Sequence, residues 1–146
     1  MNVVFDTDVL IPVILGRRSR SARLFSRLEA AGWRVATSPQ ILLEVRDKMM
    51  TKETLRQWLQ RSDEEIEQFV DRLAVVCELV PGSRQAHGVV PADPKDDKII
   101  AAAVESRAAY IVSEDKHLLG LGDYQGIKIM NREQFAAELD RLGVPE

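Results

Sequence analysis

Carboxylate side chains occur at four separate places along this chain, each beside an apolar run or at an expected helix start. They are Asp6 with Asp8, Glu44, Asp96 with Asp97, and Asp115. Asp6 directly follows residues 2–5, and Asp115 comes shortly after residues 110–112. Both of these runs are short, apolar and rich in β-branched side chains. Such runs are typical of buried strands in a parallel sheet. Because open parallel sheets bind ligands at the carboxyl ends of their strands, we expect the acidic groups to converge on one pocket.

Converging carboxylates repel one another unless positive charge lies between them. At an effective dielectric constant near 20, two such charges about 4 Å apart cost about 4 kcal/mol. We expect protons or a divalent cation to offset this repulsion. The donors are oxygen atoms only, and neither His87 nor His117 has ligand spacing, so Mg²⁺ or Mn²⁺ is favoured over zinc. A cation held in this way can activate water against a phosphodiester, as metal-dependent nucleases do.

Each acidic group also has a simpler interpretation when it is taken alone. Asp96 and Asp97 suit the positive end of a helix dipole and can serve as caps. Glu44 by itself is expected to be solvated. Strand-end aspartates such as Asp6 and Asp8 also occur in phosphatases and receiver domains. The nuclease interpretation therefore depends on all four groups, taken together and in order.

The elements that must position these acids alternate between short strands and amphipathic helices. Apolar patterns predict strands at 2–5, 33–37, 79–80, 110–112 and 127–130. They predict helices at 9–15, 17–31, 39–49, 51–59, 62–76, 96–106 and 131–142, and a capping box opens the helix at Ser62. The alternation predicts an α/β fold, in which two helix layers enclose a mostly parallel sheet of about four to five strands.

The composition is that of a folded domain, with 45% hydrophobic and 29% charged residues. We expect residues 1–146 to form one domain, because a chain of this length can bury its own core. The net charge of −3 excludes a protein that binds nucleic acid through its overall charge. A single cysteine, Cys77, excludes a disulfide framework and a thiolate zinc site. Neither a membrane span nor a signal peptide is recognisable, so we expect a soluble, cytoplasmic protein.

Four segments of the chain, in this order, resemble the PIN-domain family of endoribonucleases. They are VVFDTDVLIPVIL, TSPQILLEV, DPKDDKIIAAAVESRAAYIVSEDKHLL and GIKIMNREQFAAEL. The family typically has Asp-Thr-Asn after its first strand, Ser-Pro and a Glu in the second motif, Asp-Pro-x-Asp at a helix start, and a later Thr-x-Asp. The resemblance is greatest to the toxins of bacterial toxin–antitoxin pairs. It implies a PIN-like α/β/α sandwich, Mg²⁺- or Mn²⁺-dependent RNA cleavage, a homodimer and a cognate antitoxin.

The resemblance also assigns roles to individual side chains. It places the catalytic, metal-binding acids at Asp6, Glu44, Asp96 and Asp115. Asp97 is the alternate to Asp96, and Asp8, which stands where the family usually has Asn, is a further candidate ligand. Glu114 adds a carboxylate near Asp115. Three hydroxyls are candidates either for supporting the ligands and contacting phosphate or for buried capping, namely Thr7, Ser38 and Ser113.

A run of arginines follows the first acidic motif and contains no acidic residue. Its members are Arg17, Arg18, Arg20, Arg23 and Arg27. Such a run is either a solvated helix face or a surface that positions phosphates, and we expect Arg17, Arg18, Arg20 and Arg23 to contact the RNA backbone. Aromatic residues make up 5% of the chain, which does not favour a platform for base stacking.

Two other functions remain alternatives at this point. The run VFDTDVL is similar to the opening motif of haloacid-dehalogenase-type phosphatases, with Asp6 as the nucleophile and Asp8 as the acid. Leu10 stands where that family has threonine, and Glu44 would then have no role. The second alternative is a non-catalytic PIN-like module that binds RNA or a protein partner.

Overall fold

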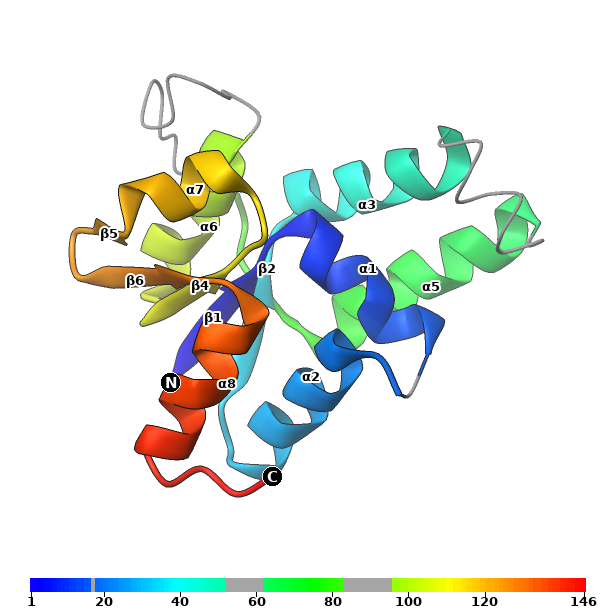
Figure 1. The fold of residues 1–146 in the computed structure, drawn as a ribbon. Helices are drawn as coiled ribbons and strands as arrows, with labels where there is room; N and C mark the ends of the chain where they lie inside the picture. Colours follow the sequence, from blue (N-terminus) through cyan, green and yellow to red (C-terminus); the bar gives the residue numbers. More distant parts are fainter. Residues whose placement is uncertain (17, 52–61, 83–95) are drawn as a thin grey trace.

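The computed structural model describes residues 1–16, 18–51, 62–82 and 96–146 (Figure 1). Within these residues six strands form one sheet in the order β3-β2-β1-β4-β6-β5. All neighbouring strands are parallel except β5 and β6, which are antiparallel. The strands are β1 Asn2–Phe5, β2 Arg34–Thr37, β3 Glu78–Leu79, β4 Tyr110–Val112, β5 Asp123–Tyr124 and β6 Ile127–Met130. The predicted α/β fold with a mostly parallel sheet is confirmed.

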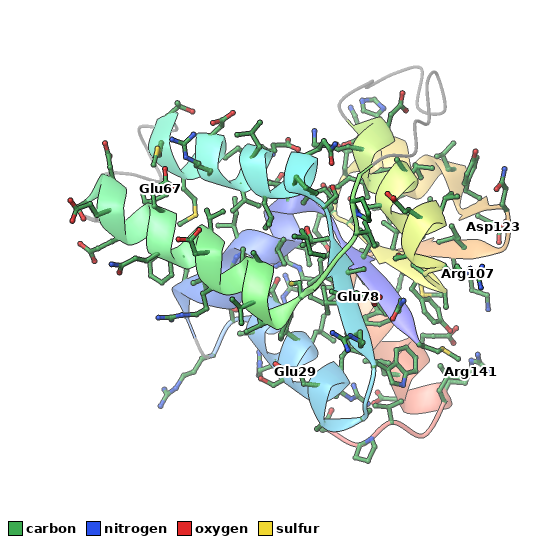
Figure 2. All side chains as sticks on the ribbon, turned by 180° about the vertical axis from the view of Figure 1, so that it is seen from behind. Glu29, Glu67, Glu78, Arg107, Asp123 and Arg141 are labelled. Atoms are coloured by element: carbon green, nitrogen blue, oxygen red, sulfur yellow. The ribbon has the colours of Figure 1, made fainter. Side chains whose placement is uncertain are left out.

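Helices cover both faces of the sheet. In Figure 1, α8 and α2 lie in front of the strands, whereas α6 lies on the face that Figure 2 shows from behind. The described helices are α1 Thr7–Leu15, α2 Arg20–Ala30, α3 Pro39–Thr51, α5 Asp63–Val76, α6 Asp97–Ser106, α7 Lys116–Leu121 and α8 Arg132–Arg141. None of these helices combines the length and apolar character needed to cross a bilayer.

The central strand β1 is buried because both of its faces are covered by helices. Val3, Val4 and Phe5 are each at most 1% exposed. Val4 pairs with Ala36 of β2 on one side and with Ile111 of β4 on the other. The continuous apolar run that predicted this strand therefore reflects its position in the middle of a parallel sheet.

Helix starts follow the capping residues that the sequence indicates. The Glu65 backbone N–H donates to Ser62 Oγ, and the Ser62 backbone N–H donates back to Glu65 Oε1, which confirms the predicted capping box. Asn131 and Gln134 form a second capping box at the start of α8. The helix predicted at 9–15 begins earlier, at Thr7, because the preceding Asp6 caps it.

Two short elements have no counterpart among the predicted ones. The six-residue helix α7 is too short to show a helical apolar period, and β5 is a two-residue strand joined to β6 by a hairpin turn. The sheet therefore has six described strands rather than four to five. β3 lies one residue earlier than predicted. The helix predicted at 51–59, apart from Thr51, and His87 lie outside the described residues.

A polar cluster anchors α8 against the amino ends of β4 and β6. Tyr110 Oη donates to Glu138 Oε2 at 2.8 Å, and the Arg141 guanidinium lies 2.5 Å from Glu138 Oε1. Lys128 lies 3.6 Å from the same carboxylate, which is almost fully buried. The hydrogen bonds from Arg141 and Tyr110, together with the nearby positive charges, lower the pKa of Glu138 to about 2.

We expect Glu138→Gln to destabilise the protein in a pH-dependent way. A carboxyl group whose pKa is lower in the folded state than its ordinary value of 4.5 stabilises the fold above that value. This contribution is lost as the pH falls from about 4.5 towards about 2. Melting temperatures should therefore differ most between wild type and variant near pH 7, and the difference should narrow in acid. Glu133→Gln, which removes an exposed carboxylate from the same helix, is the control. A constant difference across this range would show that the ionised form of Glu138 contributes nothing.

Candidate active site

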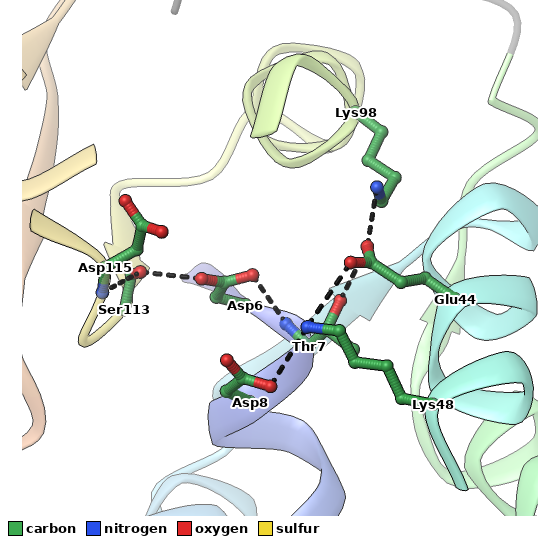
Figure 3. A network of polar contacts seen from close by, with 8 residues as sticks. All are labelled: Asp6, Thr7, Asp8, Glu44, Lys48, Lys98, Ser113 and Asp115. Carbon is green, nitrogen blue, oxygen red and sulfur yellow. Dashed lines mark hydrogen bonds and ion pairs between the residues drawn. The ribbon is translucent and has the colours of Figure 1, made fainter. Parts of the chain in front are cut away.

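The carboxyl ends of the parallel strands β1 and β4 bring Asp6 and Asp115 to one edge of the sheet, and Glu44 extends towards the same edge from α3 (Figure 3). Asp6 follows β1 and caps α1, and Asp115 follows β4 and caps α7. Asp96 is the N-cap residue of α6, and Glu44 lies on α3. Because β1 and β4 are parallel neighbours, the residues that follow them, Asp6 and Asp115, lie at the same edge of the sheet.

Asp6 is 7% exposed, and both of its carboxylate oxygens accept hydrogen bonds. Oδ1 accepts from the Thr7 backbone N–H at 2.7 Å, and Oδ2 accepts from Ser113 Oγ at 2.7 Å. Burial raises the pKa of Asp6, and the hydrogen bonds from Ser113 and Thr7 offset only part of that rise. The Asp6 carboxylate is thus held in one orientation, and burial outweighs the hydrogen bonds and the positive charge of Lys48 that favour its ionised form.

Ser113 connects Asp6 to Asp115. The Asp115 backbone N–H donates to Ser113 Oγ at 3.0 Å, while the Ser113 hydroxyl donates to Asp6. Asp115 Oδ1 accepts the backbone N–H groups of His117 and Leu118 at 2.7 and 3.3 Å, so this side chain also caps α7. The cap fixes the position of Asp115 at the same edge as Asp6.

Glu44 lies between two lysines that the sequence analysis did not single out (Figure 3). Its Oε2 is 2.5 Å from Lys98 Nζ and accepts a hydrogen bond from Thr7 Oγ1 at 3.1 Å. Its Oε1 is 3.4 Å from Lys48 Nζ, which also pairs with Asp8 at 3.1 Å. Burial by itself would raise the pKa of Glu44, but Lys98 above all, with Lys48, reverses this effect and lowers it.

These lysines correct the expectation that protons or a divalent cation must offset the repulsion between the acids. Ammonium groups already neutralise the Glu44 part of the site. A local signal for Lys48 existed, because it follows Glu44 by one helical turn on the same predicted helix. Lys98 follows Asp96 by two residues, but no local pattern indicated that it reaches a carboxylate on a different helix.

The structure distinguishes the two adjacent aspartates at the start of α6. Asp96 is 8% exposed, and its side chain makes no capping hydrogen bond with the helix. Asp97 is half-buried and is the first residue of the helix. Asp96 is therefore at the N-cap position without serving as a hydrogen-bonding cap, and its role as the ligand in preference to Asp97 stays a prediction. Asp93, the first residue of the Asp-Pro-x-Asp motif, lies outside the described residues.

The three candidate hydroxyls have two kinds of environment. Thr7 contacts Glu44 and Ser113 contacts Asp6, so both support acids of the site. Ser38 is buried, and its Oγ accepts the Ile41 backbone N–H at 3.3 Å, which makes it a cap of α3.

Hydrogen bonds link the acids of this edge, but they do not assemble a finished cation site. Among the described residues, no three His, Cys, Asp or Glu side chains lie close enough together to hold a metal ion. The donor atoms at this edge are carboxylate and hydroxyl oxygens, which is the chemistry that Mg²⁺ and Mn²⁺ prefer. The residue types therefore fit such a cation.

Arginines line a hollow of about 620 Å³ between α2 and α8. The four are Arg20, Arg23, Arg27 and Arg132. Arg27 is buried and bonds Asp140 and the Val144 carbonyl oxygen at 2.6 Å, so it belongs to the core rather than to a solvated face. Arg20 and Arg23 are exposed, as is Arg18, while Arg17 lies outside the described residues.

This hollow begins close to the edge that carries the acids. The Arg132 backbone N–H donates to Glu114 Oε2 at 2.9 Å, and Glu114 directly precedes Asp115. Arg132 therefore connects the acidic edge to the hollow that Arg20 and Arg23 line.

Cys77 has no part in this chemistry. Its side chain is buried, and burial raises the pKa of the thiol to about 12. The thiol is therefore protonated at neutral pH and packs in the core.

Comparisons with known proteins identify the family and the fold of the chain. The family model of the PIN domain matches residues 2–117. No curated protein sequence matches the chain. A chain in the crystal structure of VapBC2 from Rickettsia felis, which was solved bound to a DNA fragment from their promoter, has the same fold with a TM-score of 0.63. The two are 14% identical, and the match covers 90% of this chain and 98% of that chain.

We expect Asp96→Asn to abolish the rise in melting temperature that Mn²⁺ causes, and Asp97→Asn to retain most of it. Neighbouring helical residues point about 100° apart, so one of the two carboxylates can face a bound cation squarely. Ligands that bind only the folded state raise its melting temperature. Thermal melts of both variants with and without Mn²⁺ test this ranking. The reverse ranking would assign the ligand to Asp97.

Proposed function

The chain belongs to the PIN domain family, and from this premise we propose that it is a Mg²⁺- or Mn²⁺-dependent endoribonuclease that hydrolyses RNA phosphodiesters. The observation that carries the proposal is the hydrogen-bonded set at the carboxyl edge of the sheet. There, Ser113 joins Asp6 to Asp115, and Thr7 joins the same segment to Glu44.

Four carboxylates would hold the cation, namely those of Asp6, Glu44, Asp96 and Asp115, with Asp8 as a further candidate. When bound, a divalent cation supplies Lewis acidity, which makes a water molecule more acidic and stabilises charge on the phosphate. The oxygen-only donor set supports this choice of cation over zinc.

The side chains of the protein orient the reaction. Ser113 Oγ and the Thr7 N–H each donate to one oxygen of Asp6, so this carboxylate cannot rotate freely. A carboxylate at this edge is also suited to accept the proton of the attacking water.

We further propose that residues 1–146 act as one PIN-like domain in the cytoplasm, as the toxin of a toxin–antitoxin pair. The sequence resemblance to such toxins supports this, as does the fold shared with a chain of the VapBC2 toxin–antitoxin complex. The same resemblance suggests a homodimer and a cognate antitoxin that blocks the acidic edge.

The phosphatase alternative has no support from the structure. Leu10, which stands in place of the threonine of that family, is fully buried in the core. Asp8, which would act as the acid in a phosphatase of that family, is mostly exposed and paired with Lys48. The match to the PIN domain family over residues 2–117 accounts for the same segment.

Cleavage of a mixture of unrelated RNAs tests the proposed function. Wild type should cleave with Mg²⁺ or Mn²⁺ and stop when EDTA is added. Asp6→Asn should cleave at least about 100-fold more slowly, because even changes beside a metal ligand cost 10- to 100-fold. Asp71→Asn, an exposed change of the same chemistry on α5, should cleave like wild type. Cleavage that survives both EDTA and Asp6→Asn would contradict the proposal, and a folded wild type that binds RNA without cleaving it would favour the non-catalytic alternative.

A second prediction concerns the arginines of the α2–α8 hollow. Replacing Arg20 and Arg23 with Ala should weaken binding to unrelated RNAs to a similar extent and reduce the salt slope by up to about 2. The free energy of unfolding should change by less than about 0.5 kcal/mol per site, since both side chains are exposed. The double variant of Arg34 and Arg72, two exposed arginines on β2 and α5, removes the same charge elsewhere. Equal effects of the two double variants would mean that overall charge, rather than the hollow, determines binding.

A further inference from the structure

We propose that Lys98 is a built-in counter-ion of Glu44, which it holds in the cation-free protein and must release for a divalent cation to bind. The inference rests on the proposed function, because it concerns the same acidic edge. It assigns to Lys98 the regulation of cation affinity.

Lysine ammonium groups contact both oxygens of the Glu44 carboxylate. Lys98 Nζ is 2.5 Å from Oε2, and Lys48 Nζ is 3.4 Å from Oε1, so each oxygen faces a positive charge. Figure 3 shows Lys98 reaching Glu44 from α6, while Lys48 and Glu44 extend from the same helix, α3. The side chains of Glu44 and Lys98 are each 22% exposed. Bulk salt therefore screens this pair less than it screens a surface ion pair.

Lys98 and a divalent cation compete for the carboxylate of Glu44. An oxygen that accepts a short hydrogen bond from an ammonium group has that group in the place where a cation would bind, and the two positive charges would repel. The described carboxylates also do not lie close enough together for three of them to hold an ion.

The two lysines differ in a way that separates their roles. Lys48 has a second carboxylate partner, Asp8, at 3.1 Å, which is closer than its contact with Glu44. It can therefore remain paired with Asp8 when Glu44 moves. Lys98 makes the shorter contact with Glu44 and is the main reason that the pKa of Glu44 is lowered. Loss of Lys98 should consequently change cation affinity more than loss of Lys48.

Titration of the metal-free protein with Mn²⁺, followed by the signal of the free ion, tests this proposal without an activity assay. Lys98→Met should bind Mn²⁺ about 10-fold more tightly than wild type, because the hydrogen bond from the Lys98 ammonium group to Glu44 no longer competes with the cation. Lys98→Gln is the second neutral variant and should behave in the same way. Lys98→Arg retains the charge and should stay close to wild type, and Lys48→Met should change the affinity less than about 3-fold, since Asp8 holds that lysine.

The outcomes separate this inference from the proposed function. If wild type binds Mn²⁺ and the folded neutral variants of Lys98 bind it equally or more weakly, Lys98 is not a competing counter-ion and the inference is wrong. If neither wild type nor the variants bind Mn²⁺ at millimolar concentration, the metal-dependent function itself is wrong. Melting curves of each variant show that the affinities compare folded proteins.

Discussion

The hydrogen bond from the Asp6 backbone N–H to the Val112 carbonyl oxygen, 2.9 Å long, continues the parallel pairing of β1 with β4 beyond the last residue of β1. It brings Asp6 beside Ser113 and thereby allows the Ser113 hydroxyl to reach the Asp6 carboxylate. Strand β1, which precedes Asp6, is buried on both faces, so a shift in this register would bring the polar Asn2 or Asp6 to a position that an apolar side chain now occupies in the core. Core packing and site geometry thus depend on the same strand pairing.

The charges at the acidic edge are unevenly balanced. Burial raises the pKa of Asp6, whereas Lys98 and Lys48 lower that of Glu44. The positive charge is therefore concentrated at Glu44, while the effect of burial dominates at Asp6. The lysines reduce the repulsion between neighbouring carboxylates, which would otherwise destabilise the fold.

The opposite edge of the sheet has a different role. At the amino ends of β4 and β6, Tyr110 and Lys128 contact Glu138, and Trp33 stacks on the ring of Tyr110. These contacts anchor α8, whose first residue, Arg132, donates to Glu114 beside the acidic edge. Stabilising contacts and chemically active groups therefore occupy opposite ends of the same strands, as is usual in parallel α/β sheets.

The sequence by itself determined the parallel strands, the Ser62 capping box and the order of the acidic motifs. Each of these follows from interactions within a few residues, such as the apolar run of β1 or the reach of a serine to the third residue of its helix. Only the tertiary structure decided that Lys98 pairs with Glu44, that Arg27 is buried against Asp140 and the Val144 carbonyl, and that α7 forms after Asp115. These features depend on which helices and strands come together in space. The sequence alone does not distinguish a lysine or arginine that faces solvent from one that pairs with a distant carboxylate.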